Sequence, residues 1–343
     1  MTGISLKGFL HKIFRFISSM VLLVSLSSCW HPPFDPDVSA SVLTAQKLGS
    51  PVLEIRTRLG YNARGGYYIP CRPDYNQGFW VVFEQNRMKL SQMHYDMVNQ
   101  KWVLTNYTDY PVNDLMGLQL LPDQSSTNTL FISLTNLKGW YKITFGGGFT
   151  PFTAQGFPFL GAGYTLGDGT SEDTLNVAYL NGTQVDFSSV QTDNFTTILG
   201  PFAYTALPAT LLESPTFAVM LTGGEAYISG LSADGSTVTY YWASNTAEPV
   251  TLLIDRPLTG MLSDGRLLSD REDRLYIYEK YGSSVFSIPT GALHFSFERY
   301  DSANSQWISV FTRTLEIATN REEWEYLISI YEIPTSRLAE LAR

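Results

Sequence analysis

The sequence is poor in charge, in cysteine and in long apolar runs. Charged residues make up 16% of the 343 residues, and there are two cysteines. Two cysteines exclude a scaffold held by several disulfides, so the fold depends on a hydrophobic core. Hydrophobic residues make up 44% of the chain, which supplies such a core and excludes a disordered protein. The apolar run from Phe16 to Leu26 is shorter than the ~20 residues of a membrane-spanning helix.

Clusters of basic residues are also missing. The formal net charge is −9, from 23 basic and 32 acidic residues. Lysine and arginine are scattered, whereas proteins that bind nucleic acid gather them into patches that face the phosphate backbone. We therefore expect no nucleic-acid partner. An acidic body also gains nothing from anionic head groups, so contact with a membrane requires another kind of attachment.

The residues that usually carry catalysis or bind metal are scarce. After residue 28 the histidines are His31, His94 and His294, and no two have the spacing of a zinc site. Both the Gly-x-Ser-x-Gly elbow of hydrolases and the Gly-x4-Gly-Lys-Ser/Thr phosphate loop are missing. The sequence therefore predicts no catalytic residue, no metal and no cofactor, and it favours a binding protein over an enzyme.

Acidic residues gather near predicted turns, but without the alternating order of a calcium loop. We interpret them as solvated hairpin tips: Asp168, Glu172, Asp173, Asp234, Asp264, Asp270, Glu272 and Asp273. A pair of carboxylates for glycoside hydrolysis can come from any two strands, so that class stays open. Cys71 is expected to be a small buried hydrophobe. The Phe-rich stretch 146–163 is either a strand pair buried between sheets or a partner-binding lip.

The N-terminus has the order of a secretory signal peptide. Lys7, Lys12 and Arg15 precede the apolar run, and Leu26-Ser27-Ser28-Cys29 follows it. These four residues resemble the lipobox of bacterial lipoproteins. The resemblance implies cleavage after Ser28 and a diacylglyceryl group on Cys29, which becomes the acylated, palmitate-bearing N-terminus. Cleavage of 1–28 removes three basic residues and leaves 20 basic against 32 acidic, a net charge of −12.

The residue after Cys29 bears on which bacterial membrane the lipid anchor is expected to enter. It is Trp30, whereas an Asp at this position retains enterobacterial lipoproteins at the inner membrane. The resemblance therefore favours the outer membrane. Residues 29–50 are predicted to be the lipidated cysteine and a tether, because Pro32, Pro33 and Pro36 favour extended backbone.

Short aromatic and β-branched runs dominate the chain from Pro51 onward. Aromatic residues make up 14% of the sequence. Five pairs of runs are joined by turn sequences centred near residues 86, 138, 182, 235 and 282. A hairpin that recurs roughly every 50 residues matches the length of a propeller blade, which is a four-stranded sheet. The run 321–331 begins with helical composition and ends with the alternation of a strand; as a late strand it is expected to pair with 52–56 and close the ring.

A second internal repeat has the form Tyr-Asp-x-x-Asn-x-x-Trp. It occurs at 95–102 and at 300–307. Asp and Asn suit the turn, and Tyr and Trp flank it. The motif resembles the outer hairpin of kelch-type propeller blades, and Gly223-Gly224 resembles the kelch double glycine. Two unrelated hairpins with similar turns are the alternative, because other Gly-Gly pairs are out of phase.

These observations predict an all-β fold. We expect a β-propeller of six or seven blades over residues 51–334 and a short C-terminal helix or tail over 335–343. Two β-sandwich domains are the alternative. The predicted function is a protein-binding or scaffolding module in the bacterial envelope, attached to the membrane through the lipid. A carbohydrate-active enzyme and a periplasmic receptor for a sugar or other small ligand remain as alternatives.

Overall fold

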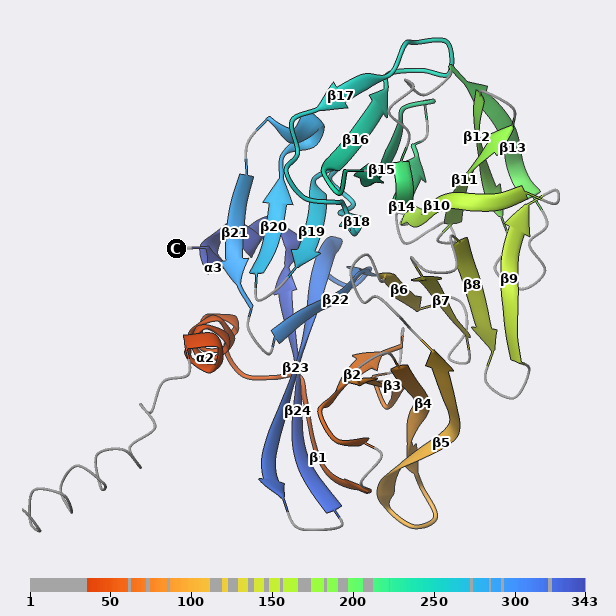
Figure 1. Cartoon of the computed structure of the whole chain (residues 1–343). Helices are drawn as coiled ribbons and strands as arrows, with labels where there is room; N and C mark the ends of the chain where they lie inside the picture. The colour runs from red at the N-terminus through yellow and green to blue at the C-terminus, as the bar shows by residue number, and fades with distance from the viewer. Residues whose placement is uncertain are drawn as a thin grey trace, which may run out of the picture.

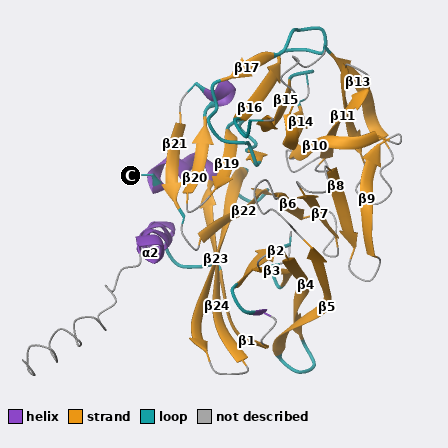
Figure 2. Cartoon of the chain, in the orientation of Figure 1, coloured by secondary structure: helices purple, strands orange, loops and turns teal. Residues whose placement is uncertain are grey.

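The strands of the chain form six four-stranded antiparallel groups arranged in a ring (Figure 1). The computed structural model describes residues 36–60, 63–71, 75–84, 87–111, 119–122, 129–134, 139–144, 148–154, 157–165, 174–181, 184–190, 197–205, 212–221, 223–232, 234–271, 274–283, 285–290, 293–319 and 323–342. All statements about structure concern these ranges. Almost every element in them is a strand, as Figure 2 shows.

Blades 1 to 3 follow one another along the chain. Blade 1 contains β2 (Gly66–Pro70), β3 (Gln77–Glu84), β4 (Arg87–Asp96) and β5 (Lys101–Pro111). Blade 2 contains β6 (Gln119–Pro122), β7 (Thr129–Leu134), β8 (Gly139–Thr144) and β9 (Gly148–Ala154). Blade 3 contains β10 (Phe157–Thr165), β11 (Thr174–Asn181), β12 (Gln184–Val190) and β13 (Thr197–Tyr204). Strands β9 and β10 take up the Phe-rich stretch, so its backbone forms part of the ring rather than a projecting lip.

Blades 4 to 6 complete the ring. Blade 4 contains β14 (Leu212–Met220), β15 (Ala226–Ser232), β16 (Thr237–Trp242) and β17 (Val250–Leu252). Blade 5 contains β18 (Gly260–Met261), β19 (Leu267–Arg271), β20 (Arg274–Tyr278) and β21 (Val285–Pro289). Blade 6 contains β22 (Leu293–Asp301), β23 (Gln306–Thr319), β24 (Glu323–Pro334) and β1 (Leu53–Gly60).

The ring is closed by the first strand of the chain. Strand β1 pairs antiparallel with β24 from Leu53↔Ile330 to Gly60↔Glu323, so the last blade takes its outer strand from the N-terminal end. This pairing confirms the predicted closure. The fold is therefore an all-β propeller with six blades in the described ranges, and the two-sandwich alternative is wrong.

Neighbouring blades pack through alternate residues of each strand. In blade 4, Phe217 and Val219 pack in a core shared with blade 5, whereas Ala218 and Met220 pack in a core shared with blade 3. Successive side chains of a strand point to opposite faces of the sheet, so both faces of the blade are apolar and both are covered. At the inner edge, β10 and β14 touch in parallel at Ala162↔Phe217, which places first strands next to the axis.

The predicted hairpins are present, but one of them lies at a different position in its blade. Strand pairs β3–β4, β7–β8, β11–β12 and β15–β16 are the second and third strands of successive blades. The fifth predicted hairpin, β20–β21, joins the third and fourth strands of blade 5. Its turn sequence, Tyr281-Gly282, has positive φ at both residues, and such a turn can end any hairpin of a blade.

The predicted tether contains a helix. Helix α2 (Pro36–Leu48) packs Ala45 and Leu48 into the core between blades 5 and 6. The extended backbone predicted from Pro36 is wrong here, because proline is tolerated in the first turn of a helix. The chain ends in η4 (Thr335–Arg337) and α3 (Leu338–Leu341), which pack beside α2 (Figure 1).

Candidate functional site

A propeller has two ends. The turns between first and second strands and between third and fourth strands lie at one end, which we call the first-turn face. The turns between second and third strands and the links between blades lie at the other end, which we call the link face. The placing of these turns and links at the two ends follows from the antiparallel order of strands within each blade.

Three titratable side chains come together at the link face. Tyr67 and His294 occupy the second positions of the inner strands β2 and β22, and their ring centroids lie 5.2 Å apart. Asp270 lies near the end of β19 and is close enough for its charge to raise the pKa of Tyr67. We call these residues of blades 1, 6 and 5 the link-face cluster. All three are partly exposed.

The surroundings of the link-face cluster suppress charge. Burial raises the pKa of Asp270 to about 7 and lowers the pKa of His294. Burial is also the main cause of the raised pKa of Tyr67. Near neutral pH the cluster therefore offers a protonated hydroxyl, a neutral imidazole and a carboxyl group that is divided between its protonated and ionised forms, all of which can form hydrogen bonds. Such groups suit a polar, uncharged ligand.

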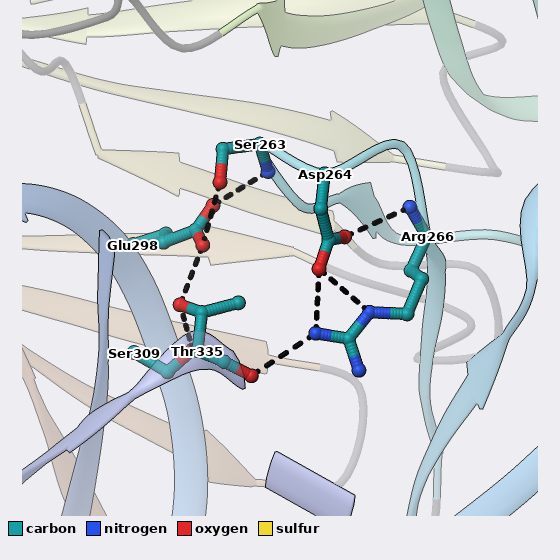
Figure 3. A network of polar contacts seen from close by, with 6 residues as sticks. All are labelled: Ser263, Asp264, Arg266, Glu298, Ser309 and Thr335. Carbon is teal, nitrogen blue, oxygen red and sulfur yellow. Dashed lines mark hydrogen bonds and ion pairs between the residues drawn. The ribbon is translucent and has the colours of Figure 1, made fainter. Parts of the chain in front are cut away.

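A buried carboxylate joins blade 5 to blade 6 near the first-turn face (Figure 3). Glu298 of β22 is 2% exposed and accepts hydrogen bonds from the Ser263 backbone N–H at 2.7 Å and the Ser263 hydroxyl at 3.0 Å. It also accepts one from the Thr335 hydroxyl at 2.6 Å, and the hydroxyls of Thr335 and Ser309 lie 2.9 Å apart. The carboxylate thus ties the β18–β19 turn to the C-terminal end of β24.

All three donors to Glu298 are neutral. Burial raises the pKa of Glu298, and the charge of Asp264 adds to the rise, whereas the hydrogen bonds from Thr335 and Ser263 oppose it. Beside it, Arg266 pairs with Asp264 at 2.6 Å and donates to the Thr335 carbonyl at 3.0 Å. Arg266 pairs with Asp264 and not with Glu298, so the hydrogen bonds to Glu298 come from neutral donors alone (Figure 3).

An ion pair within blade 6, on the other side of the same strand, contacts blade 1 through Tyr75. Arg299 follows Glu298 in β22 and faces the opposite neighbour. Its guanidinium donates to both carboxylate oxygens of Glu332, at 2.8 and 2.9 Å. The Tyr75 hydroxyl donates to Glu332 and accepts from Arg299 at 3.1 Å. This network ties the β2–β3 connection of blade 1 to blade 6.

A third polar contact joins blade 4 to blade 5. Lys280 of η3 (Lys280–Gly282) pairs with Glu225 at 2.9 Å, and the Tyr281 hydroxyl also donates to Glu225, at 3.4 Å. The rings of Tyr227, Tyr241 and Tyr281 contact one another in sequence, the first pair tilted and the second edge to face, with centroids 4.9 and 5.0 Å apart. This row of rings runs from the buried Tyr227 to the exposed Tyr281.

The two Tyr-Asp turns have the same local geometry. In the first, Asp96 accepts from the Val98 backbone N–H at 2.9 Å, and Tyr95 and Trp102 pair edge to face. In the second, Asp301 accepts from the Ala303 backbone N–H at 3.1 Å, and Tyr300 and Trp307 pair in the same way. The Asn side chain of each motif donates to its Asp, at 2.6 and 2.7 Å.

Their places in the blades differ. The first motif joins β4 to β5, the outer hairpin of blade 1, as the kelch resemblance implies. The second joins β22 to β23, the inner hairpin of blade 6, so it is not an outer hairpin.

The other residues singled out in the sequence have varied outcomes. Cys71 is fully buried, as predicted. Asp234 lies at an exposed turn where its carboxylate accepts from Ser236, as predicted for a hairpin tip. Asp270 is not a solvated tip but a member of the link-face cluster, because the strand continues through it. Cys29, His31, Asp168, Glu172, Asp173, Glu272 and Asp273 lie outside the described residues.

Within the described ranges, no group of three or more His, Cys, Asp or Glu side chains is arranged to hold a metal ion. In the same ranges no helix is long and apolar enough to cross a membrane. Sequence reasoning missed Tyr67, Glu298, Arg299 and Glu332. None of the four had a signal in the sequence: Glu298 falls at a polar position of the alternating Leu293–Phe297 run, and a bulge between Phe295 and Phe297 turns it to the face toward blade 5.

Comparisons with known proteins give the following. No protein-family model matches the chain, and no curated protein matches it. The Dos1 propeller is similar with 9% identity and a TM-score of 0.35, over 82% of this chain and 94% of that one. A triple mutant of AofleA from Arthrobotrys oligospora is similar with 10% identity and a TM-score of 0.35, over 84% and 93%. Luciferin-regenerating enzyme is similar with 10% identity and a TM-score of 0.31, over 82% and 98%. Because these scores are low, the propeller assignment rests on strand order and ring closure.

Proposed function

We propose that this chain is a lipid-anchored protein of the bacterial cell envelope whose propeller is a protein-binding or scaffolding module. Cys29 is the proposed site of lipid attachment, because Leu26-Ser27-Ser28-Cys29 has the lipobox order. Trp30 at the following position favours the outer membrane. Blades joined by apolar cores and by polar contacts give a rigid body, which suits a docking surface.

The observation that carries this proposal is the seating of α2. Thr44 donates to the Pro289 carbonyl at 2.6 Å, and Lys47 donates to the Leu341 carbonyl at 3.1 Å, so the helix is fixed to blade 5 and to α3. Only residues 30–35 separate Cys29 from α2. Six residues span at most about 20 Å. A lipid on Cys29 would therefore hold the propeller close to the membrane, with one side facing it.

Metabolic labelling tests the anchor. Cells that express the full chain are fed a clickable palmitate analogue, and the membrane fraction is examined. The natural chain is expected to carry the label, and Cys29→Ala is expected to lose it and to keep the signal peptide. Label retained by Cys29→Ala would contradict lipidation at this residue.

The binding role is tested separately. Reversible cross-linking of the lipidated protein in intact cells is expected to give discrete adducts with envelope proteins. A purified chain that gives no adduct but turns over a substrate would contradict the module and support the enzyme alternative.

The link-face cluster favours a second candidate function, a receptor for a sugar or another small polar ligand. An aromatic ring beside a carboxyl and an imidazole group is a common arrangement for hydroxyl-rich ligands. A thermal-shift screen of neutral sugars is the test. Stabilisation that disappears in Asp270→Asn and in Tyr67→Phe would support the receptor, and a shift that survives both changes would place the ligand elsewhere.

A further inference from the structure

Two neighbouring blade junctions differ in what closes their outer margin. Between blades 5 and 6, helices α2 and α3 cover the core and add Ala45, Leu48, Leu338 and Leu341 to it. Between blades 4 and 5, the core consists of strand and loop residues, among them Val219, Tyr227, Leu267 and Tyr278, and no described helix contributes. The second junction is therefore left without the helical cover that the first has.

Exposed apolar side chains lie at the margin of the second junction. Val250 begins β17, the outer strand of blade 4, and Val285 begins β21, the outer strand of blade 5; they are 55% and 53% exposed. Tyr281, 44% exposed, lies in the turn before β21. We call these three residues the outer patch. Large exposed apolar residues that gather in one place indicate an interaction site.

Strand register shows that the outer patch is continuous with the core between blades 4 and 5. Val250 is the cross-strand partner of Tyr241, whose ring contacts Tyr281 at 5.0 Å. Val285 is the cross-strand partner of Tyr278, which is buried in that core. Cross-strand partners share a face of their sheet. Both valines therefore lie on the two sheet faces that enclose the core, at its outer edge.

The exposed tyrosine is held in place rather than free to turn. Tyr281 has φ 66°, in the left-handed region that a residue with a bulky side chain seldom adopts. Its ring contacts Tyr241 edge to face, and Lys280 lies 5.0 Å from the ring centroid. A tyrosine fixed by its neighbours loses little conformational entropy when a partner covers it.

The charge around the outer patch is acidic. Lys280 is neutralised by Glu225, and Arg256 by Asp255. Glu248 and Glu279 are exposed near the starts of β17 and β21, and among the described residues neither forms an ion pair. The remaining charge near the patch is therefore negative, which favours a partner with basic side chains.

We propose that the outer patch binds an amphipathic helix of a partner protein, with small and apolar residues on the contacting face and lysine or arginine beside them. Helix α2 is the precedent within this chain: it seats Thr44, Ala45 and Leu48, which share one face of the helix, against the neighbouring junction. The partner helix lies at the outer edge of the junction between blades 4 and 5, at the starts of β17 and β21, whereas α2 is anchored at the end of β21. This inference rests on the proposed binding function and names its partner class.

A peptide titration with the full chain is the first test. The probe is a synthetic helix with Leu and Ala along one face and Lys along the other, labelled for fluorescence anisotropy. Binding is expected to weaken by about tenfold in Val285→Asp and in Val250→Asp. Val98→Asp is the matched control, because Val98 is 89% exposed in the distant β4–β5 turn. Unchanged thermal unfolding of each variant shows that the fold is intact.

One further peptide and one variant test whether charge contributes to binding at the outer patch. A helix with Glu in place of Lys is expected to bind more weakly, and Glu279→Lys is expected to weaken the Lys helix. Equal binding of a peptide with scrambled apolar residues, or equal binding by Val285→Asp, would overturn the proposal. Self-association of the chain that Val285→Asp abolishes would also overturn it, because the occupant would then be a second copy.

Site-specific photo-cross-linking separates this inference from the proposed function. A photoreactive residue is placed at position 285 of the lipidated protein in cells, and at position 98 as the control. A partner adduct from position 285 alone is expected. Adducts formed by general cross-linking, with none from position 285, would refute the outer patch and leave the binding role standing. No adduct by either method would refute the binding role itself.

Discussion

Two carboxylates of blade 6 face opposite neighbours and are stabilised by different means. Glu298 accepts only from neutral donors and is almost fully buried. Glu332 has the bidentate guanidinium of Arg299, and the side chains of this pair are 30% and 19% exposed. Each carboxylate joins blade 6 to a different blade. Glu298 joins the neighbouring blade through hydrogen bonds from Ser263, whereas Glu332 is held by an ion pair within blade 6 and joins blade 1 through the Tyr75 hydroxyl.

This difference predicts which blade junction loses more stability when one of its residues is substituted. Water reaches the Arg299–Glu332 pair and replaces part of whatever a substitution removes. Around Glu298 the carboxylate and the Thr335 hydroxyl are buried, so a lost acceptor leaves Thr335 with Ser309 alone, whereas water reaches the exposed Ser263. We therefore expect the larger losses of stability, and the larger dependence on pH, at the junction between blades 5 and 6.

Glu298→Ala is expected to have the largest effect. It leaves the Ser263 N–H, the Ser263 hydroxyl and the Thr335 hydroxyl without their acceptor and opens a cavity. We expect the free energy of unfolding to fall by about 3 kcal/mol. Denaturant unfolding measures it. Glu298→Gln, which keeps the shape and one acceptor oxygen, is the control and should lose less; equal losses would show that the hydrogen bonds are unimportant.

The pH dependence of stability sharpens the comparison. Burial raises the pKa of Glu298, so the folded chain holds a proton that the unfolded chain releases at the ordinary glutamate pKa. Its contribution to stability is present below that ordinary value and is lost as pH rises through the raised pKa. Asp270, with its pKa near 7, acts in the same direction.

In Glu298→Gln the free energy of unfolding should fall less steeply as pH rises, because the amide does not titrate. Denaturant unfolding of the natural chain and of the variant between pH 4 and pH 7.5 measures the difference. Parallel curves would mean that Glu298 has the same pKa in both states. Asp270→Asn is a second control, and it should remove the remaining loss near neutral pH.

Arg299→Ala breaks the ion pair on the other side of blade 6. The Tyr75 hydroxyl still donates to Glu332, and water reaches the partly exposed carboxylate. We expect a loss of about 1 kcal/mol that becomes smaller at high salt. Combining Arg299→Ala with Glu332→Gln in a double-mutant cycle isolates the pair. A loss as large as that of Glu298→Ala would remove the contrast between the two junctions.

The sequence predicted the features of the fold that depend on neighbouring residues. Turn residues such as Asp234-Gly235 and alternating strands identified the hairpins, and the length of the interval suggested blades. Ring closure by β1 was also predicted, because a propeller needs an outer strand for its last blade. Helix α2 was not predicted, because the prolines near its start also favour extended backbone.

The polar contacts between blades could not be predicted in the same way. Glu298 and Arg299 are adjacent in sequence, yet their partners Ser263 and Glu332 lie about 35 residues away in opposite directions. Which residues meet depends on the register of β22 against β23 and on the face that each side chain takes. Asp270 shows the same limit, since a position near a turn gave no sign that it is partly buried close to Tyr67 of blade 1.

The Tyr-Asp turns test how far local geometry acts alone. Asp96 and Asp301 accept the same hydrogen bonds in an outer and in an inner hairpin, and those bonds lower the pKa of both carboxyls. We therefore expect Asp96→Ala and Asp301→Ala to give the smallest losses of stability, equal to each other. Each natural contribution should be lost as pH falls through the lowered pKa, opposite in sign to that of Glu298. Thermal unfolding at pH 3 and pH 6 measures this. A clearly larger loss for Asp301→Ala would mean that the inner hairpin transmits the change to the Glu298 contact four residues from its turn, and that the two copies are not equivalent.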